Sequence, residues 1–325
     1  MNTYLVVGAG PIGSAVARQL AERNDGADHV IVATRSGSGP VGANIERIHL
    51  DATDEAAVKQ AAAGTAAIFN CVNPPYTRWS QDWPPIAHSL LAAAIASGAV
   101  LATCSNLYAY GPSAQPVTTD LPLAALGTKG QVRARMWSDA LAAHESGDAR
   151  VVEVRGSDYL GPDVESHMGE RVVPRVLAGK KVSVVGSPDQ PHSWTYSEDM
   201  AATLIAAADS PSAWGRAWHS PVNQPRTQAE VVSDMATALG TSNVAVKGLP
   251  KPMLSAAGVF VPMIRELKET LYQFEAPFVI DDRETREILG LEPTPWGEII
   301  DAHVRNYRDP GETDAADALL RGAAR

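Results

Sequence analysis

Short apolar runs alternate with helical stretches through the first half of the chain. Runs of mostly apolar residues, bounded by turn residues, predict buried strands. They lie at 4–7, 30–34, 45–50, 67–72, 100–104 and 151–154. Stretches with a helical period fall between them, at 14–23, 55–63, 86–97 and 131–144. This alternation is typical of α/β proteins with helices on both faces of a parallel sheet, so we expect a doubly wound parallel sheet.

The first predicted strand runs directly into GAGPIG at residues 8–13, which fits G-x-G-x-x-G between a strand and a helix. Gly8 permits the tight turn, Gly10 lets the backbone approach a pyrophosphate, and Gly13 lets the helix pack close to the strand. The helix N-terminus presents free N–H groups to phosphates. The turn therefore predicts a Rossmann dinucleotide-binding domain. Two further residues of the turn, Pro11 and Ile12, are expected to contact the cofactor.

After Arg155 the pattern loosens, and loops rich in Gly, Pro and Asp separate shorter elements. Helices are predicted at 197–208, 228–239 and 264–274. We interpret residues 1–158 as the dinucleotide-binding domain and 159–325 as a smaller substrate-binding region. We expect about residues 193–220 of this region to pack back on the first sheet.

The end of the second predicted strand bears on the choice of cofactor. NAD sites usually carry Asp or Glu there, which accepts a hydrogen bond from the ribose 2′-hydroxyl. This chain has Thr34-Arg35-Ser36 instead, with no acid between Val30 and Pro40. Arg35 can pair with a 2′-phosphate, and the two hydroxyls can add hydrogen bonds, so NADP(H) is favoured over NAD(H). The alternative is that Arg35 is a solvated surface side chain.

Two later strand ends add candidate cofactor contacts. Asp51 and Ala52 follow the third strand, where such folds pass the adenine. Asp51 is equally placed to cap the helix that follows it. Val72 and Asn73 end the fourth strand, near the expected path of the nicotinamide ribose.

Four stretches, in chain order, resemble the extended and atypical short-chain dehydrogenase/reductases, the NAD-dependent epimerase/dehydratase family. They are the glycine turn, TCSNLYAYG at 103–111, RGSDYLGP at 155–162 and WTYSEDMA at 194–201. The resemblance covers most of the chain, and it implies a Rossmann fold, a nicotinamide cofactor and an enzyme. The spacing G-x-G-x-x-G is more typical of the atypical members.

The family's catalytic motif, Y-x-x-x-K on the helix after the Tyr-Gly loop, is degenerate in this chain. Its Tyr is the general acid or base, and its Lys lowers the Tyr pKa and holds the nicotinamide ribose. No Tyr lies between Gly111 and Arg155. If Lys129 matches the family Lys, Ala125 stands at the Tyr position. If Arg133 matches it, Lys129 stands there.

Substitutes for the missing Tyr come from the same region. Tyr108 follows the fifth strand at the carboxyl edge of the sheet, where it can donate a proton or form an aromatic wall. Lys129 can hold the cofactor ribose, act as an acid if desolvation lowers its pKa, or stay solvated. The family's Ser/Thr position falls on Asn106, with Ser105 one place earlier. Substrate contacts are expected from Tyr76, Tyr108, Asp158, Tyr159 and Trp194.

Composition narrows the class of partner. A net charge of -10 argues against nucleic acid, which needs clustered Lys and Arg. The two cysteines form no disulfide framework and favour a reducing, cytoplasmic location. We find no signal peptide, no apolar run of about 20 residues and no metal-ligand spacing among the histidines. We expect a small-molecule substrate and no membrane partner, and leave a homodimer open.

The favoured function is an NADP(H)-dependent oxidoreductase of atypical short-chain type that acts on a small, fairly apolar carbonyl or alcohol. His192-Ser193-Trp194 stands where the family often has an Arg-Asp pair that helps to bind a nucleotide-sugar, and Asp158 replaces the family's Asn. Both differences argue against a nucleotide-sugar substrate. Two alternatives stay open: epimerase or dehydratase chemistry through a keto intermediate, and a non-catalytic NADP(H)-binding sensor.

Overall fold

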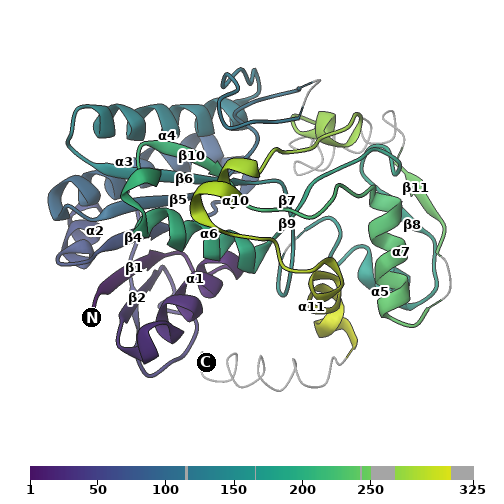
Figure 1. Cartoon of the computed structure of the whole chain (residues 1–325), viewed down its shortest axis with the longest axis horizontal. Coiled ribbons are helices and arrows are strands. Elements are labelled where there is room, and N and C mark those ends of the chain that lie inside the picture. Colours follow the sequence, from purple (N-terminus) through teal and green to yellow (C-terminus); the bar gives the residue numbers. More distant parts are fainter. Residues whose placement is uncertain (114–115, 165, 242–243, 250–267, 309–325) are drawn as a thin grey trace.

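A parallel seven-stranded sheet forms the centre of the computed structural model, which describes residues 1–113, 116–164, 166–241, 244–249 and 268–308 (Figure 1). The strand order is β10-β6-β5-β4-β1-β2-β3. The strands are β1 Thr3–Val7, β2 His29–Thr34, β3 Ile45–His49, β4 Ala67–Asn70, β5 Val100–Asn106, β6 Arg150–Gly156 and β10 Arg216–His219. The predicted α/β fold with a doubly wound parallel sheet is confirmed.

The strand order reverses beside β1, which pairs with β2 on one side and β4 on the other. Open α/β sheets bind ligands at the carboxyl ends of their strands, at such a point of reversal. Here that point lies directly after Val7 and Asn70. The glycine turn therefore occupies the position where this class of sheet binds its ligand.

Helices cover both faces of the sheet. Side chains alternate along β1, so that Tyr4 and Val6 face one layer while Leu5 and Val7 face the other. The first layer contains α1 Pro11–Glu22 and α6 Ser197–Asp209. The second contains α2 Glu55–Ala62, α3 Trp79–Ser97 and α4 Thr128–Glu145. Burial on both sides explains why the strands read as nearly continuous apolar runs.

Helix α3 begins seven residues before the predicted start at residue 86, and it includes Pro84 and Pro85. Prolines inside a helix cost hydrogen bonds, so the pattern predicted a later start. The earlier turn is stabilised by Trp79 and Trp83, which are buried and lie one turn apart on the same face. The Arg133 guanidinium lies 4.8 Å and 4.3 Å from their ring centroids. Tertiary packing thus outweighs the proline cost.

Residues 197–219 return to the sheet. Helix α6 packs beside α1, and β10 pairs with β6 from Arg216↔Val152 to His219↔Arg155. The strand β10 was not predicted, because it is short and has only one neighbouring strand in the sheet. Between α6 and β10 lies a 3-10 turn, η3, at Pro211–Ala213.

The smaller region lies beside the sheet and has its own core (Figure 1). Its strands form two parallel pairs, β7 Asp158–Leu160 with β9 Trp194–Tyr196, and β8 Val182–Val184 with β11 Val246–Gly248. Its helices are α5 Val173–Leu177, α7 Gln228–Ala238 and α11 Trp296–Arg308, while α10 Arg283–Leu289 contacts α6 and β10. The remaining short turns are η1 Asn24–Gly26, η2 Tyr76–Arg78 and η4 Leu271–Phe274.

The helix predicted at 264–274 falls partly outside the described residues, at 264–267. Its last part is the short 3-10 turn η4 rather than an α-helix. Within the ranges that the structure describes, no helix has both the length and the apolar character to span a bilayer.

His219, a fully buried side chain at the end of β10, makes stability depend on pH. Its Nδ1 faces the Asp281 carbonyl at 2.9 Å and its Nε2 faces the Tyr110 hydroxyl at 3.2 Å. Burial lowers its pKa to about 4. Between that value and the ordinary 6.5, the unfolded chain binds a proton that the folded chain does not. The free energy of unfolding should therefore fall by roughly 3 kcal/mol as pH drops through this window.

Urea unfolding at neutral pH and near pH 4.5 measures this dependence. The His219→Gln variant should lose less stability than the wild type over the same change, because its side chain does not titrate. Equal losses in the two proteins would assign the acid sensitivity to other groups.

Candidate functional site

Packing requires glycine at two positions of the glycine turn and leaves open space at a third. Gly8 has φ +96°, and a Cβ there would lie 2.6 Å from the Cys71 carbonyl oxygen. A Cβ on Gly13 would lie 1.9 Å from the Gly8 carbonyl oxygen. A Cβ on Gly10 would meet nothing within 4 Å. The turn thus keeps an open space beside Gly10, of the kind that a pyrophosphate requires.

Helix α1 begins at this open position. Gly10 is its N-cap and supplies no side-chain cap, and Pro11 occupies the first helical position. The N–H groups of Ile12 and Gly13 therefore lack a side-chain acceptor at the cap, and they carry the positive end of the helix dipole. An uncapped N-terminus beside an open backbone fits a dinucleotide phosphate.

Thr34, Arg35 and Ser36, at the end of β2, have two different roles. The Thr34 hydroxyl donates to the Ser38 carbonyl at 2.8 Å, and the Ser36 hydroxyl lies 2.6 Å from that of Ser38. Both predicted hydroxyls therefore build the turn. The Arg35 side chain is exposed, and no residue in the described part of the chain forms a hydrogen bond with it.

Asp51 and Asp54 have separate roles after β3. The Asp51 carboxylate accepts from the Thr53 N–H at 2.9 Å and its hydroxyl at 2.8 Å. These bonds, with the charges of Arg35 and His49, lower its pKa. Asp54 is the residue that caps α2, through the Ala57 N–H at 3.1 Å. Asp51 is therefore not the helix cap, and the adenine contact stays a prediction.

The predicted contacts next to these strand ends lie at the same edge. Ala52 is buried behind Asp51. Val72 donates its N–H to the Asn70 side chain at 3.3 Å, and Asn73 is exposed directly after it.

The end of β5 positions Tyr108. Asn106 accepts a hydrogen bond from the Tyr108 N–H at 3.1 Å, which tightens the turn that carries the phenol. The Ser105 hydroxyl is buried and has no hydrogen-bond partner among the described residues. Asn106 thus has a positioning role, while the Ser105 hydroxyl keeps its hydrogen-bonding capacity.

Tyr108 and Tyr76 form a hydroxyl pair at the carboxyl edge. Their oxygens lie 2.5 Å apart, and the Trp79 ring lies 5.9 Å from that of Tyr108. Burial raises the pKa of both phenols, for Tyr108 well above 10. Both therefore stay protonated near neutral pH. Because one hydroxyl donates to the other, one phenolic proton is left for a ligand.

Helix α4 places Lys129 and Arg133 one turn apart on a buried face. The Lys129 side chain is only 2 % exposed, with its Nζ 3.8 Å from the Glu269 carboxylate and 5.6 Å from the Tyr76 ring centroid. Ala125 precedes α4, which begins at Thr128. Lys129 lies on the helix in either alignment, whereas Ala125, the Tyr position when Lys129 matches the family Lys, lies before it.

Asp158 joins this set from the start of β7. Its carboxylate oxygens lie 2.8 Å from His192 Nε2 and 3.7 Å from His167 Nδ1. Burial opposes ionisation, but the His192 hydrogen bond and the histidine charges outweigh it, so the pKa of Asp158 lies below its usual value. Its charge in turn helps to raise the pKa of the tyrosines that share this space. These are Tyr76, Tyr108 and Tyr272.

Three of the predicted substrate residues, Tyr76, Tyr108 and Asp158, are thus brought together. Tyr159 faces away from them, and Trp194 lies beside His192, with 4.8 Å between ring centroids. The Tyr159 hydroxyl donates to the Ser105 carbonyl at 3.0 Å, and its ring packs on the core of the α1 layer. Successive side chains of a strand point to opposite faces, so Asp158 and Tyr159 cannot share one. Trp194 is buried and donates its indole N–H to the Arg226 carbonyl at 2.8 Å.

Sequence reasoning missed the pairing of His192 and His167 with Asp158. The motif comparison treated His192 only as the loss of a family Arg, and nothing in the local pattern pairs it with Asp158. The pairing of β7 with β9 aligns Asp158 with Trp194. Because His192 is two residues before Trp194, this pairing brings the side chains of His192 and Asp158 together.

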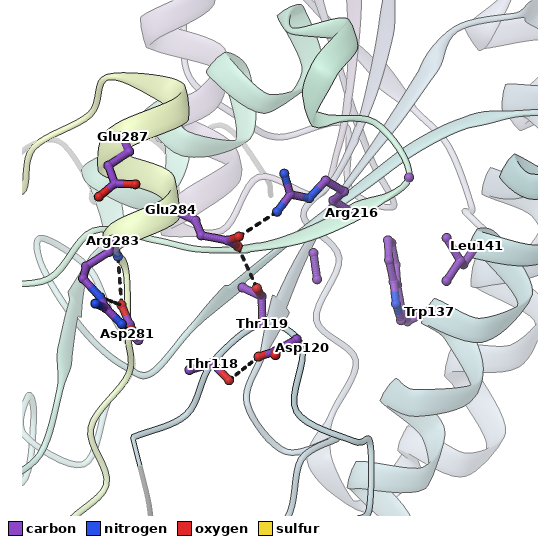
Figure 2. Close-up of a pocket in the computed structure, with 12 residues that line it drawn as sticks. Thr118, Thr119, Asp120, Trp137, Leu141, Arg216, Asp281, Arg283, Glu284 and Glu287 are labelled. Atoms are coloured by element: carbon purple, nitrogen blue, oxygen red, sulfur yellow. Dashed lines mark hydrogen bonds and ion pairs between the residues drawn. The ribbon is translucent and has the colours of Figure 1, made fainter.

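Two cavities lie away from these residues. One, of about 550 Å³, lies beyond the edge strand β10 and is lined by α4, α10 and residues 118–120 (Figure 2). Its polar side chains pair with one another, since Glu284 accepts from Arg216 at 2.9 Å and from Thr119 at 3.0 Å. The other, of about 420 Å³, lies between α3 and α4. None of the predicted site residues lines either cavity.

Comparison with known proteins identifies the class. Residues 4–218 match the model of the NAD dependent epimerase/dehydratase family, so the chain belongs to this enzyme family. No curated protein matches it in sequence.

Solved structures with the same fold cover nearly the whole chain. UDP-glucuronic acid 4-epimerase from Bacillus cereus, in complex with NAD, aligns with a TM-score of 0.77 at 17% identity, over 97% of this chain and 99% of that one. UDP-glucose 4-epimerase from Thermotoga maritima, with UDP-glucose, gives 0.76 at 18% identity, over 95% and 99%. The dTDP-glucose 4,6-dehydratase DesIV from Streptomyces venezuelae gives 0.74 at 19%, over 95% and 97%. At these identities the likeness shows the fold.

Proposed function

We propose that this protein is an NADP(H)-dependent oxidoreductase that interconverts a small carbonyl compound and its alcohol. The observation that carries the proposal is the convergence of Tyr76, Tyr108 and Asp158 at the carboxyl edge where the strand order reverses. Phenolic protons and aromatic walls at this edge suit a small polar group held against an apolar surface.

Family membership supports a nicotinamide dinucleotide as the cofactor. Two of the compared structures hold NAD. When bound, a nicotinamide supplies or accepts hydride. The glycine turn and the first turn of α1 would hold the pyrophosphate, Lys129 the ribose, and Arg35 the 2′-phosphate. The charge of Arg35 is what supports NADP(H) over NAD(H).

The chain's own residues position the substrate. The Tyr108 hydroxyl donates a hydrogen bond to the substrate oxygen, where negative charge develops during reduction of a carbonyl. The nearby carboxylate of Asp158 disfavours an anionic substrate by like-charge repulsion. A compact, uncharged carbonyl compound fits this arrangement better than a diphosphate.

A second candidate follows from the compared structures, whose names describe enzymes of dTDP- and UDP-sugars. In that case the chain would carry out epimerase or dehydratase chemistry on a nucleotide-sugar through a keto intermediate. Asp158 and His192, where the family has Asn and often Arg, are the residues that make it the weaker candidate.

The test is NADPH oxidation across a panel of aldehydes and ketones, with UDP-glucose and dTDP-glucose assayed for conversion in parallel. Reduction of one or more small carbonyls, with no change in either sugar nucleotide, is the expected result. Conversion of a sugar nucleotide would favour the second candidate. Tight NADPH binding with no turnover anywhere would identify a sensor instead.

Arg35→Ala tests the cofactor assignment. Loss of a charge-assisted contact with the 2′-phosphate should weaken NADPH binding by about 10- to 100-fold, and leave NADH binding unchanged. Fluorescence titration of both cofactors measures the two affinities. The control is Arg47→Ala, which removes an exposed Arg from β3. Equal NADPH affinity in wild type and Arg35→Ala would rule out the Arg35 contact.

A further inference from the structure

His192 faces a hydrogen-bond acceptor with each of its ring nitrogens. Nδ1 lies 3.2 Å from the Gln273 carbonyl oxygen, and Nε2 lies 2.8 Å from an oxygen of Asp158. A carbonyl can only accept, so Nδ1 carries a proton. If the ring held that proton alone, the Nε2 lone pair would face a carboxylate oxygen. Nε2 also lies 3.3 Å from the Ser157 hydroxyl, but the carboxylate oxygen at 2.8 Å is the nearer partner. The imidazolium–carboxylate form puts the second proton on Nε2, opposite Asp158, whose pKa lies below its usual value.

The two partners differ in access. The His192 side chain is 2 % exposed, whereas that of Asp158 is 22 % exposed. The His192 ring is stacked against Phe274, at 4.9 Å between centroids, and against Phe278, at 5.8 Å. The histidine is thus closed to a ligand and fixed in orientation. Asp158 is the member of the pair that a substrate can reach.

We infer that Asp158 is the acid–base group of the substrate pocket, with His192 as the residue that positions it and stores its proton. The inference rests on the proposed function. In it, Asp158 takes the role of the tyrosine that the family motif has and this chain lacks. When hydride adds to the carbonyl carbon of a substrate, as a bound nicotinamide would supply it, a C–H bond forms, the C=O π electron pair moves to oxygen, and the oxygen takes the shared proton. An O–H bond forms, and the pair is left as neutral imidazole and carboxylate. In the oxidation direction the carboxylate takes the proton back from the alcohol.

The other groups that face the pair do not compete for this role. Tyr76, Tyr108 and Tyr272 have phenols whose pKa is raised chiefly by burial, so they donate hydrogen bonds but release a proton poorly. Burial lowers the pKa of His167, which is therefore neutral near pH 7. The hydrogen bond between His192 and Asp158 holds a proton that can leave without ionising a buried phenol.

The inference fixes the sign of the pH dependence. Carbonyl reduction needs the shared proton, so the rate should fall as pH rises through the loss of that proton. Asp158→Asn keeps the shape of the side chain and lets its amide N–H donate to Nε2, but it has no proton to give. This variant should lower kcat by about 10²- to 10⁴-fold and remove the falling limb of the pH profile. NADPH affinity should stay within about twofold of the wild type, because residue 158 is not part of the glycine turn that is proposed to bind the cofactor.

Two further variants separate positioning from folding. His192→Gln should also lower kcat and remove the limb. His219→Gln, which replaces another buried histidine with two hydrogen bonds, should keep both kcat and the limb. A purely structural role for Asp158 would instead leave the limb in place in Asp158→Asn and change only KM or the melting temperature.

Nitrogen-15 NMR of the His192 ring gives a readout that needs no substrate. We expect Nε2 to be protonated in the wild type near neutral pH, and unprotonated in Asp158→Asn. An Nε2 without a proton in the wild type between about pH 5 and 8 would overturn the inference, as would an intact pH limb in Asp158→Asn. If the wild type reduces none of the carbonyls, the proposed function fails, and the ring titration alone then decides whether the pair holds the proton.

Discussion

Gly13→Ala should destabilise the protein by about 1–3 kcal/mol and weaken NADPH binding by about 10²-fold or more. The added Cβ would lie 1.9 Å from the Gly8 carbonyl oxygen, a hard backbone atom that cannot rotate away. Helix α1 must then move off the turn, and its first N–H groups lose their aim at the pyrophosphate. Urea unfolding and NADPH titration measure the two effects.

Gly10→Ala is the matched variant, because the Cβ it adds meets nothing within 4 Å in the protein itself. Its cost to stability should stay below about 1 kcal/mol, as expected for alanine at an N-cap. Its NADPH affinity should still fall by about tenfold or more, which corresponds to about 1.4 kcal/mol of binding free energy. Wild-type affinity in Gly10→Ala would show that no phosphate approaches this backbone.

Tyr108→Phe should lower kcat/KM for the carbonyl substrate by about 10²-fold, with NADPH affinity unchanged. The variant keeps the ring and its packing on Trp79, and removes the hydrogen bond to the oxygen on which charge develops. Steady-state kinetics with the substrate found in the panel measure the effect.

Tyr76→Phe is the control for Tyr108, because it removes the partner hydroxyl at 2.5 Å and leaves the Tyr108 phenol free for the substrate. Its effect on kcat/KM should be clearly smaller. Equal losses in the two variants would mean that the hydroxyls act as a unit, and an unchanged rate in Tyr108→Phe would assign this residue to the pocket wall.

The sequence predicted the sheet well because its signal is local. A strand buried on both faces has a nearly continuous apolar sequence. The glycine turn at residues 8–13 directly follows one such run, at residues 4–7. The start of α3 was not predictable in this way. Pro84 and Pro85 argue locally against a helix, and only the packing of Trp79 and Trp83 on Arg133, 50 residues later in the chain, outweighs them.

In the candidate site too, residues marked by the local sequence could be proposed, and residues brought together by distant contacts could not. The cofactor contacts stay predictions, but their residues could be proposed from the sequence because they follow strand ends in a fixed order along the chain. The partner of Asp158 was not found, because His192 lies 34 residues away and reaches it only through the pairing of two three-residue strands. Tyr159, the neighbour of Asp158, was assigned to the substrate although strand alternation turns its ring to the opposite face. Periodicity assigns a face only once the strand itself is recognised.

If a dinucleotide binds at the uncapped beginning of α1, as proposed, the stability of the protein depends on how much of that dinucleotide the cell holds. Gly10 offers no side chain to the amides of the first turn, so the chain leaves this helix end to be completed from outside. A dinucleotide at about a thousand times its Kd would add about 4 kcal/mol to the free energy of unfolding. The cellular level of the dinucleotide would then govern resistance to proteolysis as well as occupancy of the turn, and a shortage would raise the unfolded fraction on which proteases act.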